Sequence, residues 1–409
     1  MLALNTIQII LVVIGSVMLL QLALECWCAV IHDWFIGDGS KKAAEEDGQD
    51  REPATFVIPA HNEASIIRDM LTEFKKQVRE NDHVIVVAHN CSDETAEVAR
   101  EFNVHVCEYD APDEIGKAFA LAGGVDYARD HHLESSCIVV MDADCYGEPH
   151  AMDRLVRYIQ KSGRVVQSIY MMRQGEDDNS VISQVSTLAL YIKNHVRLLG
   201  LNVLGMPVQI TGSGFGMPYS MAMQINFRST ALAEDMRLGM ELACVGQGAV
   251  LCENARVSAL LPENNEIAEK QRTRWEHGHL EILFGCAPRL IKSAIVHAHP
   301  RLLLSALDLA VPPLAVTTVL TIALLFVVGA IGALTGEVVP FIILFISACL
   351  AGGGIMLGWI QFARKDVPLS VIWKIPRYVV WKVPIYFKFF GKRQSGWVKT
   401  KRDEEEHKQ

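Results

Sequence analysis

Cysteine pairs with the spacing of a structural metal site are missing from this chain. Ten cysteines occur among 409 residues, and no two of them form a CxxC motif. The number is also low for a small fold that is held together by disulfides. These absences argue against structural zinc and a disulfide framework, and they favour reduced cysteines in a domain that faces the cytosol.

Positive charge is also scarce. The chain carries 38 Lys and Arg against 47 Asp and Glu, a formal net charge of -9, and its middle contains no basic block. Nucleic-acid binders usually carry a basic surface that releases counterions from the phosphates. We therefore expect no nucleic-acid partner.

The first apolar run lacks the basic start of a secretory signal. It extends from Ile7 to Ile31, with Gln21 and Glu25 as its main polar interruptions, and no Lys or Arg precedes Lys41. A spanning helix needs about 20 mostly apolar residues, and a cleavable signal begins with basic ones. The sequence thus favours an uncleaved membrane anchor over a cleaved signal peptide.

Two further apolar runs lie near the C-terminus. Hydrophobic residues make up 50% of the chain, and they gather at its two ends. Leu309–Leu334 and Val338–Phe362 are separated only by Thr335–Glu337, which predicts a helical hairpin that crosses a bilayer twice. A buried core hairpin is the alternative, but two adjacent runs of this length favour the membrane.

Basic and aromatic residues follow the hairpin. The segment Arg364–Arg402 holds eleven Lys and Arg against one acid, Asp366, and five Trp and Tyr are spread along it. This composition is typical of the cytoplasmic membrane surface. It places the N-terminus outside, and the middle of the chain and the tail inside. A merely solvated basic tail is the weaker alternative.

These segments divide the chain into five parts. We expect an N-terminal transmembrane anchor at 1–36, a polar linker at 37–53, a cytoplasmic domain at 54–300, a transmembrane hairpin at 301–363 and an interfacial tail at 364–409. The whole is then an integral membrane protein whose middle domain faces the cytoplasm, with membrane lipids as neighbours.

Short β-rich runs alternate with helical stretches in the first half of the middle domain. The expected strands are 55–59, 84–88, 104–106 and 137–141, and the expected helices are 63–78, 93–102 and 117–129. Such alternation predicts an α/β fold with a doubly wound, mostly parallel sheet. Ligands bind at the carboxyl ends of the strands in sheets of this kind.

Polar clusters follow three of these strands. They are Pro59–Glu63, His89–Thr95 and Asp142-Ala-Asp144, and all three lie at one edge of the expected sheet. A single polar cluster would be an ordinary helix cap. A DxD motif without the other clusters would be a solvated turn. Two carboxylates at the end of a buried strand can instead hold a divalent cation, which would bridge the phosphates of a nucleotide.

Two later motifs could complete such a site. Glu234-Asp235 is an acidic pair in which Asp235 could act as a general base, although an acidic first turn of a helix would look the same. Gln271-Arg-Thr-Arg274-Trp275 could stabilise a diphosphate and stack on a sugar ring. Alone, this motif would be a solvated helix face.

Taken together, the ordered motifs resemble those of family 2 glycosyltransferases, in the branch with cellulose, chitin and hyaluronan synthases and bacterial exopolysaccharide transferases. The resemblance covers roughly residues 54 to 285. It rests on the motifs above together with Gly116-Lys117 and Thr211-Gly-Ser-Gly214.

The resemblance implies a GT-A fold, a UDP-sugar donor, Mg or Mn, and inversion at the anomeric carbon. It assigns Asp235, beside Glu234, as the base and Asp144 with Asp142 to the metal. Nucleotide-sugar contacts fall to Pro59, Glu63, Asp93, Lys117, Asp142, Gln271 and Arg274. Acceptor contacts fall to Trp275, Gly212, Ser213 and Gly214.

The chain departs from the family pattern at two points. His89 stands where many relatives carry an acid that reads the base, so it either replaces that acid or is a plain surface residue. Polymerising relatives that export their product usually have more C-terminal helices. We therefore expect export to depend on other proteins.

Three functions compete. The first is transfer of a sugar to a polysaccharide or lipid-linked glycan for the cell envelope. The second is a ceramide-type lipid glucosyltransferase, which shares the acidic positions and a similar final motif. The third is a non-catalytic scaffold that binds nucleotide-sugars.

Overall fold

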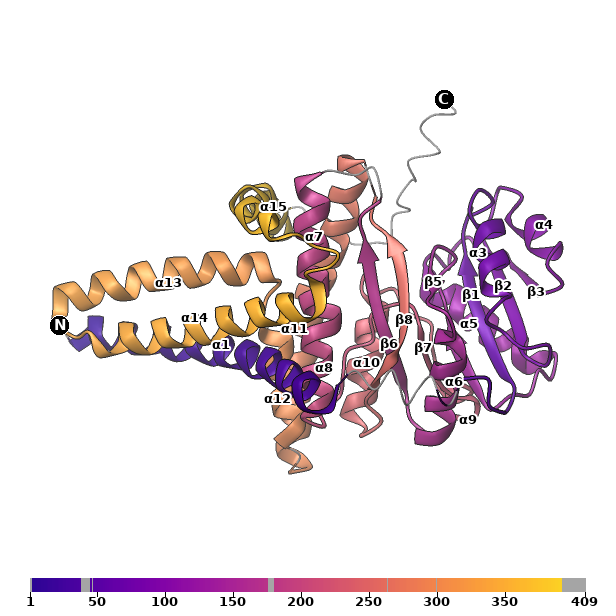
Figure 1. The fold of residues 1–409 in the computed structure, drawn as a ribbon, viewed down its shortest axis with the longest axis horizontal. Coiled ribbons are helices and arrows are strands. Elements are labelled where there is room, and N and C mark those ends of the chain that lie inside the picture. The colour runs from indigo at the N-terminus through magenta and orange to yellow at the C-terminus, as the bar shows by residue number, and fades with distance from the viewer. Residues whose placement is uncertain are drawn as a thin grey trace. The chain divides into compact units, whose positions relative to one another are not determined.

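The computed structural model describes residues 2–37, 45, 47–175, 180–262, 264–298 and 300–391. The chain forms two compact units (Figure 1). We call Gly37–Gly175 with Pro207–Ile282 the sheet unit, and Met1–Ile36, Glu176–Met206 and Leu283–Arg393 the helical unit. Residues 38–44 and 46 of the predicted linker, and the tail beyond residue 391, lie outside the described residues. The five predicted domain boundaries stay a prediction.

An eight-stranded sheet forms the centre of the sheet unit, in the order β3-β2-β1-β4-β7-β6-β8-β5. The strands β1 to β4 run parallel to one another, and β6 and β8 are parallel to each other. The strand β7 is antiparallel to β4 and β6, and β5 is antiparallel to β8. The strands are β1 Ala54–Ala60, β2 His83–His89, β3 His105–Tyr109, β4 Cys137–Val140, β5 Tyr146–Gly147, β6 Val166–Arg173, β7 Phe215–Pro218 and β8 Val250–Leu260. The predicted mostly parallel, doubly wound sheet is confirmed.

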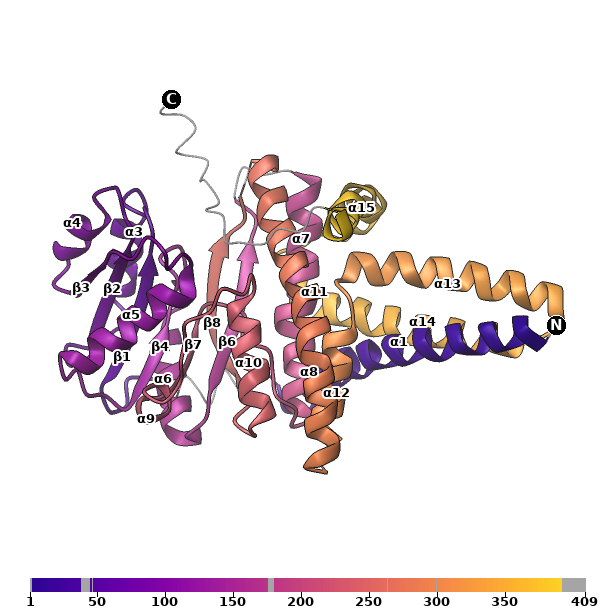
Figure 2. The ribbon, with the colours of Figure 1, turned by 180° about the vertical axis from the view of Figure 1, so that it is seen from behind.

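Helices cover both faces of this sheet (Figure 2). They are α3 Ile67–Phe74, α4 Thr95–Arg100, α5 Lys117–Asp130, α6 Ala151–Ser162, α9 Tyr219–Ala222, α10 Glu234–Cys244 and the first part of α11 Asn265–Val296. Helix α5 packs closely on β1 and β2, because a Cβ at Gly124 would lie 2.5 Å from Val57 and 2.8 Å from Val87. This close approach directs Lys117, at the start of α5, toward the strand ends.

Parallel pairing brings three loops to one edge of the sheet. Ala60 pairs with Ala88 at the ends of β1 and β2, and Val57 of β1 pairs with Val140 at the end of β4. The residues that follow these strands are therefore neighbours in space although they lie up to 80 residues apart in the chain.

The helical unit contains three helices that are long and apolar enough to cross a membrane. They are α1 Leu2–Ile36, α13 Leu314–Thr335 and α14 Val339–Gly358, which continues into a π-helical turn Trp359–Ala363. In both views they lie side by side (Figures 1 and 2). They correspond to the three predicted apolar runs.

Shorter elements complete the helical unit. They are α7 Val181–Tyr191, a π-helical turn Ile192–Arg197, α8 Leu198–Val203, the second part of α11, α12 Pro300–Ala310, a 3-10 helix Leu369–Lys374 and α15 Ile375–Gly391. The segment from α7 to α8 is an insertion between β6 and β7 of the sheet. Most of its side chains are buried within the helical unit, which its sequence alone did not indicate.

A buried ion cluster joins the parts of the helical unit. Arg197 binds Glu25 of α1 through Nε at 2.6 Å and Asp308 of α12 through a terminal nitrogen at 2.6 Å. Gln21 donates to the other oxygen of Glu25 at 2.8 Å. Because an unpaired charge is costly in an apolar setting, this cluster ties the π-helical turn Ile192–Arg197 to α1 and α12.

A second ion network fastens the start of β1 within the sheet unit. Arg51 has a fully buried side chain and pairs with Asp82 at 2.6 Å and Asp153 at 2.7 Å. Asp153 also pairs with Arg79 at 2.8 Å and with Arg157. One carboxylate thus holds three guanidinium groups from three segments of the chain.

Replacing that carboxylate should destabilise the protein. Asp153→Ala leaves Arg51 buried with only one of its two carboxylate partners. Breaking a buried ion pair typically lowers the free energy of unfolding by about 3 kcal/mol, which corresponds to a fall in melting temperature of about 6 °C or more. Thermal unfolding of the full chain in detergent measures this. Glu101→Ala, which removes the exposed Arg68–Glu101 pair, is the control and should shift the temperature little. Equal shifts would contradict a special role for the network.

Candidate active site

The loops after β1 and β2 are tied to each other by side chains. Oδ1 of Asn62 accepts a hydrogen bond from the Ser92 amide at 2.7 Å. Asp93 accepts from the Ala64 amide at 3.0 Å, and Thr95 Oγ1 accepts from the Glu63 amide at 2.8 Å. The predicted nucleoside-binding residues Glu63 and Asp93 therefore lie on adjoining loops. Asp93 also serves as a brace between the two loops.

His89 ends β2 and is only 3% exposed. Its ring stacks on Tyr109 at a centroid distance of 5.2 Å, and the amide nitrogen of Asn90 lies 3.2 Å from its Nε2. Burial, with His61 nearby, lowers the pKa of His89. His89 is thus a buried aromatic neighbour of β3 and not a plain surface residue. Pro59 lies within β1, beside Val87 of β2.

The two aspartates after β4 form the candidate metal centre. Carboxylate oxygens of Asp142 and Asp144 and the sulfur of Cys145 all lie within 4.8 Å of one another. The Cys145 thiol donates to Oδ1 of Asp144 at 3.4 Å. Two adjacent carboxylates are a donor set that suits a hard divalent cation such as Mg or Mn. The residues therefore fit the predicted metal.

Lys117 links this centre to the loop before β7. Its Nζ lies 2.5 Å from Oδ1 of Asp142 and donates to the carbonyl of Gly212 at 2.5 Å. Burial and Asp144 raise the pKa of Asp142, although Lys117 opposes them. Burial lowers the pKa of Lys117, but Asp142, Glu234 and Asp235 outweigh it and hold that pKa above its ordinary value. The ammonium group thus stays charged among carboxylates.

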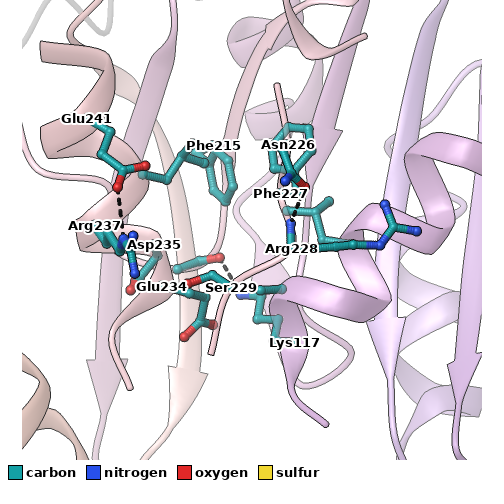
Figure 3. Close-up of a pocket in the computed structure, with 14 residues that line it drawn as sticks. Lys117, Phe215, Asn226, Phe227, Arg228, Ser229, Glu234, Asp235, Arg237 and Glu241 are labelled. Atoms are coloured by element: carbon teal, nitrogen blue, oxygen red, sulfur yellow. Dashed lines mark hydrogen bonds and ion pairs between the residues drawn. The ribbon is translucent and has the colours of Figure 1, made fainter. Parts of the chain in front are cut away.

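Glu234 and Asp235 open helix α10 and line a cavity of about 540 Å³, including its open mouth, together with Lys117 (Figure 3). A Cβ built on Gly212, whose φ is +100°, would lie 3.1 Å from Oδ2 of Asp235. Burial, and Asp235 beside it, raise the pKa of Glu234 to about 7. The acidic pair therefore forms the first turn of a helix and also faces the cavity.

The Gln271–Trp275 motif lies on α11, next to the start of α10. A Cβ on Gly278 would lie 2.9 Å from the Cβ of Ala233, and the charge of Arg274 acts on Glu234. Oε1 of Gln271 and Nε of Arg274 are buried without a hydrogen-bond partner among the described residues. Such groups are available for a polar ligand. The guanidinium of Arg272 lies 4.9 Å above the ring of Trp275.

The structure therefore gathers part of the predicted site residues, whereas Pro59, Glu63 and Asp93 lie at or beside the ends of β1 and β2 without a described contact to this group. Lys117 contacts Asp142 and Gly212 directly, and Asp235 lies close to Gly212. Asp144, Glu234 and Arg274 adjoin this group. The sequence reasoning missed other lining residues, among them Asn226–Ser229, Arg237 and Glu241. Its motifs contained no signal for these. Cys145 could have been noticed because it directly follows the DxD.

The raised pKa of Glu234 predicts a pH-dependent stability. Between pH 4.5 and about 7 the unfolded chain releases a proton that the folded chain keeps, so the carboxyl group destabilises the fold increasingly as the pH rises through this range. Glu234→Gln should therefore raise the melting temperature more at pH 8 than at pH 5, measured with a chelator present. Glu241→Gln is the control on the same helix. If Glu234→Gln raised the melting temperature equally at both pH values, the raised pKa of Glu234 would be contradicted.

Comparison with known proteins agrees with the geometry. The family model described as "Glycosyltransferase like family 2" matches residues 52–278, more than half of the chain. Among curated proteins of Bacillus subtilis (strain 168), "Uncharacterized glycosyltransferase YkcC" is 27% identical over 30% of this chain and 38% of its own length. "Probable glycosyltransferase YdaM" is 25% identical over 57% of each. The chain thus spans less than two thirds of both relatives.

A solved structure extends the likeness in fold to nearly the whole chain. The mannosyltransferase PcManGT from Pyrobaculum calidifontis, in complex with GDP-Man and Mn2+, aligns with a TM-score of 0.50 and 14% identity over 93% of this chain and 100% of its own. The expected GT-A type of fold, with flanking apolar helices, is thereby confirmed. The chain belongs to the family 2 glycosyltransferases.

Proposed function

We propose that the protein is an inverting, metal-dependent glycosyltransferase of the branch that contains polysaccharide synthases and exopolysaccharide transferases. It moves a sugar from a UDP-sugar to a polysaccharide or lipid-linked glycan in cell-envelope synthesis. The observation that carries this proposal is the meeting of Asp142, Lys117 and Asp235 around Gly212. This arrangement supports a site in which Asp142 with Asp144 would hold the metal, Lys117 would bind phosphate and Asp235 would act as the base.

Asp235 is the general base of the proposed reaction. It takes the proton of an acceptor hydroxyl, and the freed oxygen forms a bond to the anomeric carbon from the face opposite the nucleotide. The bond from that carbon to the phosphate oxygen breaks, and its electron pair leaves with the nucleoside diphosphate. The configuration at the anomeric carbon is thereby inverted.

Charge on the departing diphosphate needs compensation. Asp144 and Asp142 would hold a Mg or Mn ion, which when bound neutralises part of the diphosphate charge. Lys117 and Arg274 supply fixed positive charge, and Gln271 supplies an amide. Because Asp142 engages Lys117 at 2.5 Å, the phosphate competes with this carboxylate for the same ammonium group.

The other predicted residues bind the two substrates. Glu63, Asp93 and Pro59 lie at or beside the ends of β1 and β2 and form the nucleoside side of the site. Trp275 and the loop Gly212-Ser213-Gly214 support the acceptor. His89 is a buried imidazole at the position where many relatives carry an acid that reads the base. Guanine as well as uracil nucleotides should therefore be tested as donors.

The protein is proposed to work at the cytoplasmic face of a bacterial inner membrane. The second part of α11 exposes apolar side chains such as Phe284 and Ile295, and exposed basic side chains such as Arg289 and Lys292 lie between them in the chain. Near α15, Trp373 is 85% exposed and is followed by Lys374. Apolar and basic side chains in alternation suit the headgroup region of anionic lipids. Export of a polymer would require partner proteins.

A donor screen on purified protein tests the proposal. Transfer from one nucleotide-sugar that depends on Mg or Mn, with mass analysis of the product, is the expected result. A small lipid-soluble glycoside would favour the ceramide-type alternative over a polysaccharide or lipid-linked glycan. Absence of both transfer and donor hydrolysis, with nucleotide binding retained, would favour a non-catalytic scaffold.

Replacing the proposed base should abolish turnover without loss of donor binding. Asp235→Asn is expected to lower kcat by about 10²–10⁴, the usual contribution of a general base, while the Kd of the nucleotide from calorimetry stays within a few-fold. Glu241→Gln is the matched control, because Glu241 lines the same cavity but pairs with Arg237 at 2.8 Å. Near-normal turnover in Asp235→Asn would remove Asp235 from this role.

The proposed orientation predicts opposite accessibility of two tags. An epitope inserted after Gly336, between α13 and α14, should be cleaved by protease added to intact spheroplasts. The same epitope after Gln409 should be protected until the membrane is lysed. The reverse pattern would overturn the orientation.

A further inference from the structure

Gln167 lies in strand β6 beneath the candidate site and belongs to none of the motifs. Its side chain is fully buried, and its backbone pairs with Phe215 of the antiparallel strand β7. A buried amide must be satisfied by the protein around it. The hydrogen-bond partners of the Gln167 side chain therefore indicate its role.

Those partners belong mainly to the loop Thr211–Gly214. Oε1 of Gln167 accepts from the Thr211 amide at 3.0 Å. Its Nε2 donates to the carbonyls of Ser213 at 2.9 Å and Gly214 at 3.4 Å, and also to that of Ser168 at 2.9 Å. One side-chain amide thus binds both ends of a four-residue loop.

The opposite side of the same loop contacts the proposed catalytic groups. The carbonyl of Gly212 accepts from Lys117 at 2.5 Å, and Oγ of Ser213 accepts from the backbone amide of Asp142 at 3.0 Å. The Cα of Gly212 carries no side chain where Asp235 approaches. The position of the loop therefore determines the distances between the lysine, the metal-binding aspartate and the base.

We propose that Gln167 is a positioning residue for glycosyl transfer, because its amide holds the loop that spaces Lys117, Asp142 and Asp235. The inference rests on the proposed function of the same site. Only an amide supplies an acceptor for the Thr211 N–H together with donors for the two loop carbonyls. Gln167→Met keeps the approximate shape but removes both. An ionised Glu keeps the acceptor and turns the donor side into a second acceptor that faces carbonyl oxygens.

The test compares Gln167→Met and Gln167→Glu with a matched control, Gln77→Met. Gln77 donates to the carbonyl of Gly147 at 2.8 Å in the same unit and touches no residue of the loop in the bonds described. At a temperature where all variants are folded, we expect kcat to fall by about 100-fold in both Gln167 variants, since a displacement of about 1 Å in a reacting group can cost that much. Gln77→Met should keep kcat within about two-fold of the original chain.

The pH dependence of Gln167→Glu provides a readout that a merely structural role would not give. A buried Glu has a raised pKa, and its protonated form again offers one acceptor and one donor. The ratio of its kcat to that of the original chain should therefore rise by about tenfold as the pH falls from 8.5 to 6. The ratio for Gln167→Met should stay constant.

Different results would overturn the positioning role of Gln167 and the proposed glycosyltransferase function. If the original chain transfers sugar and both Gln167 variants keep kcat within about two-fold, the positioning role is wrong. If Gln167→Met does not fold, Gln167→Glu alone tests the inference. In that case a ratio of its kcat to that of the original chain that is constant with pH overturns the positioning role of Gln167. If the original chain neither binds a nucleoside diphosphate with Mn nor transfers sugar, the proposed function itself fails.

Discussion

One partly buried lysine among carboxylates is the interaction on which the site depends. Lys117 binds Asp142 directly and lies within the field of Glu234 and Asp235. Without this charge the three carboxylates would repel one another in a poorly solvated place. Together with the backbone carbonyl of Gly212, the lysine allows an acidic site to exist before any substrate arrives. In the proposed reaction a diphosphate would replace carboxylate oxygens as the lysine's partner, so the positive charge that it requires would already be in place.

The topology of the sheet makes this interaction possible. Parallel pairing of β1, β2 and β4 brings the ends of three strands to one edge, and Gly124 lets α5 approach closely enough to deliver Lys117 there. The antiparallel strand β7 then returns beside β4, so that its preceding loop lies against Asp142. The helical insertion between β6 and β7 belongs to the other unit. The loop that spaces the site is therefore continuous in sequence with a segment packed among the apolar helices.

Sequence patterns were sufficient for the first four strands and for the three apolar helices, whereas the grouping of Lys117, Asp142 and Asp235 in one site came from the family resemblance. The patterns succeeded because strands and apolar helices follow local periodicity, and because polar residues at the ends of parallel strands meet at one edge of a sheet. They missed Gln167, because a single buried amide in a strand has no pattern of its own. The ion cluster of Glu25, Arg197 and Asp308 was missed for a similar reason, since its members lie up to 283 residues apart. The roles of Glu63, Asp93 and Trp275 stay predictions, because such roles depend on a bound substrate.

The central claim is that Asp142 and Asp144 hold a cation against a diphosphate beside Lys117. The most direct measurement is an experimental structure of the full chain with Mn and a nucleoside diphosphate, in which anomalous scattering locates the metal. The account predicts one manganese peak in contact with carboxylate oxygens of both aspartates, and a phosphate oxygen within hydrogen-bond distance of the Lys117 ammonium group. A manganese ion bound elsewhere, or a diphosphate out of reach of Lys117, would contradict it.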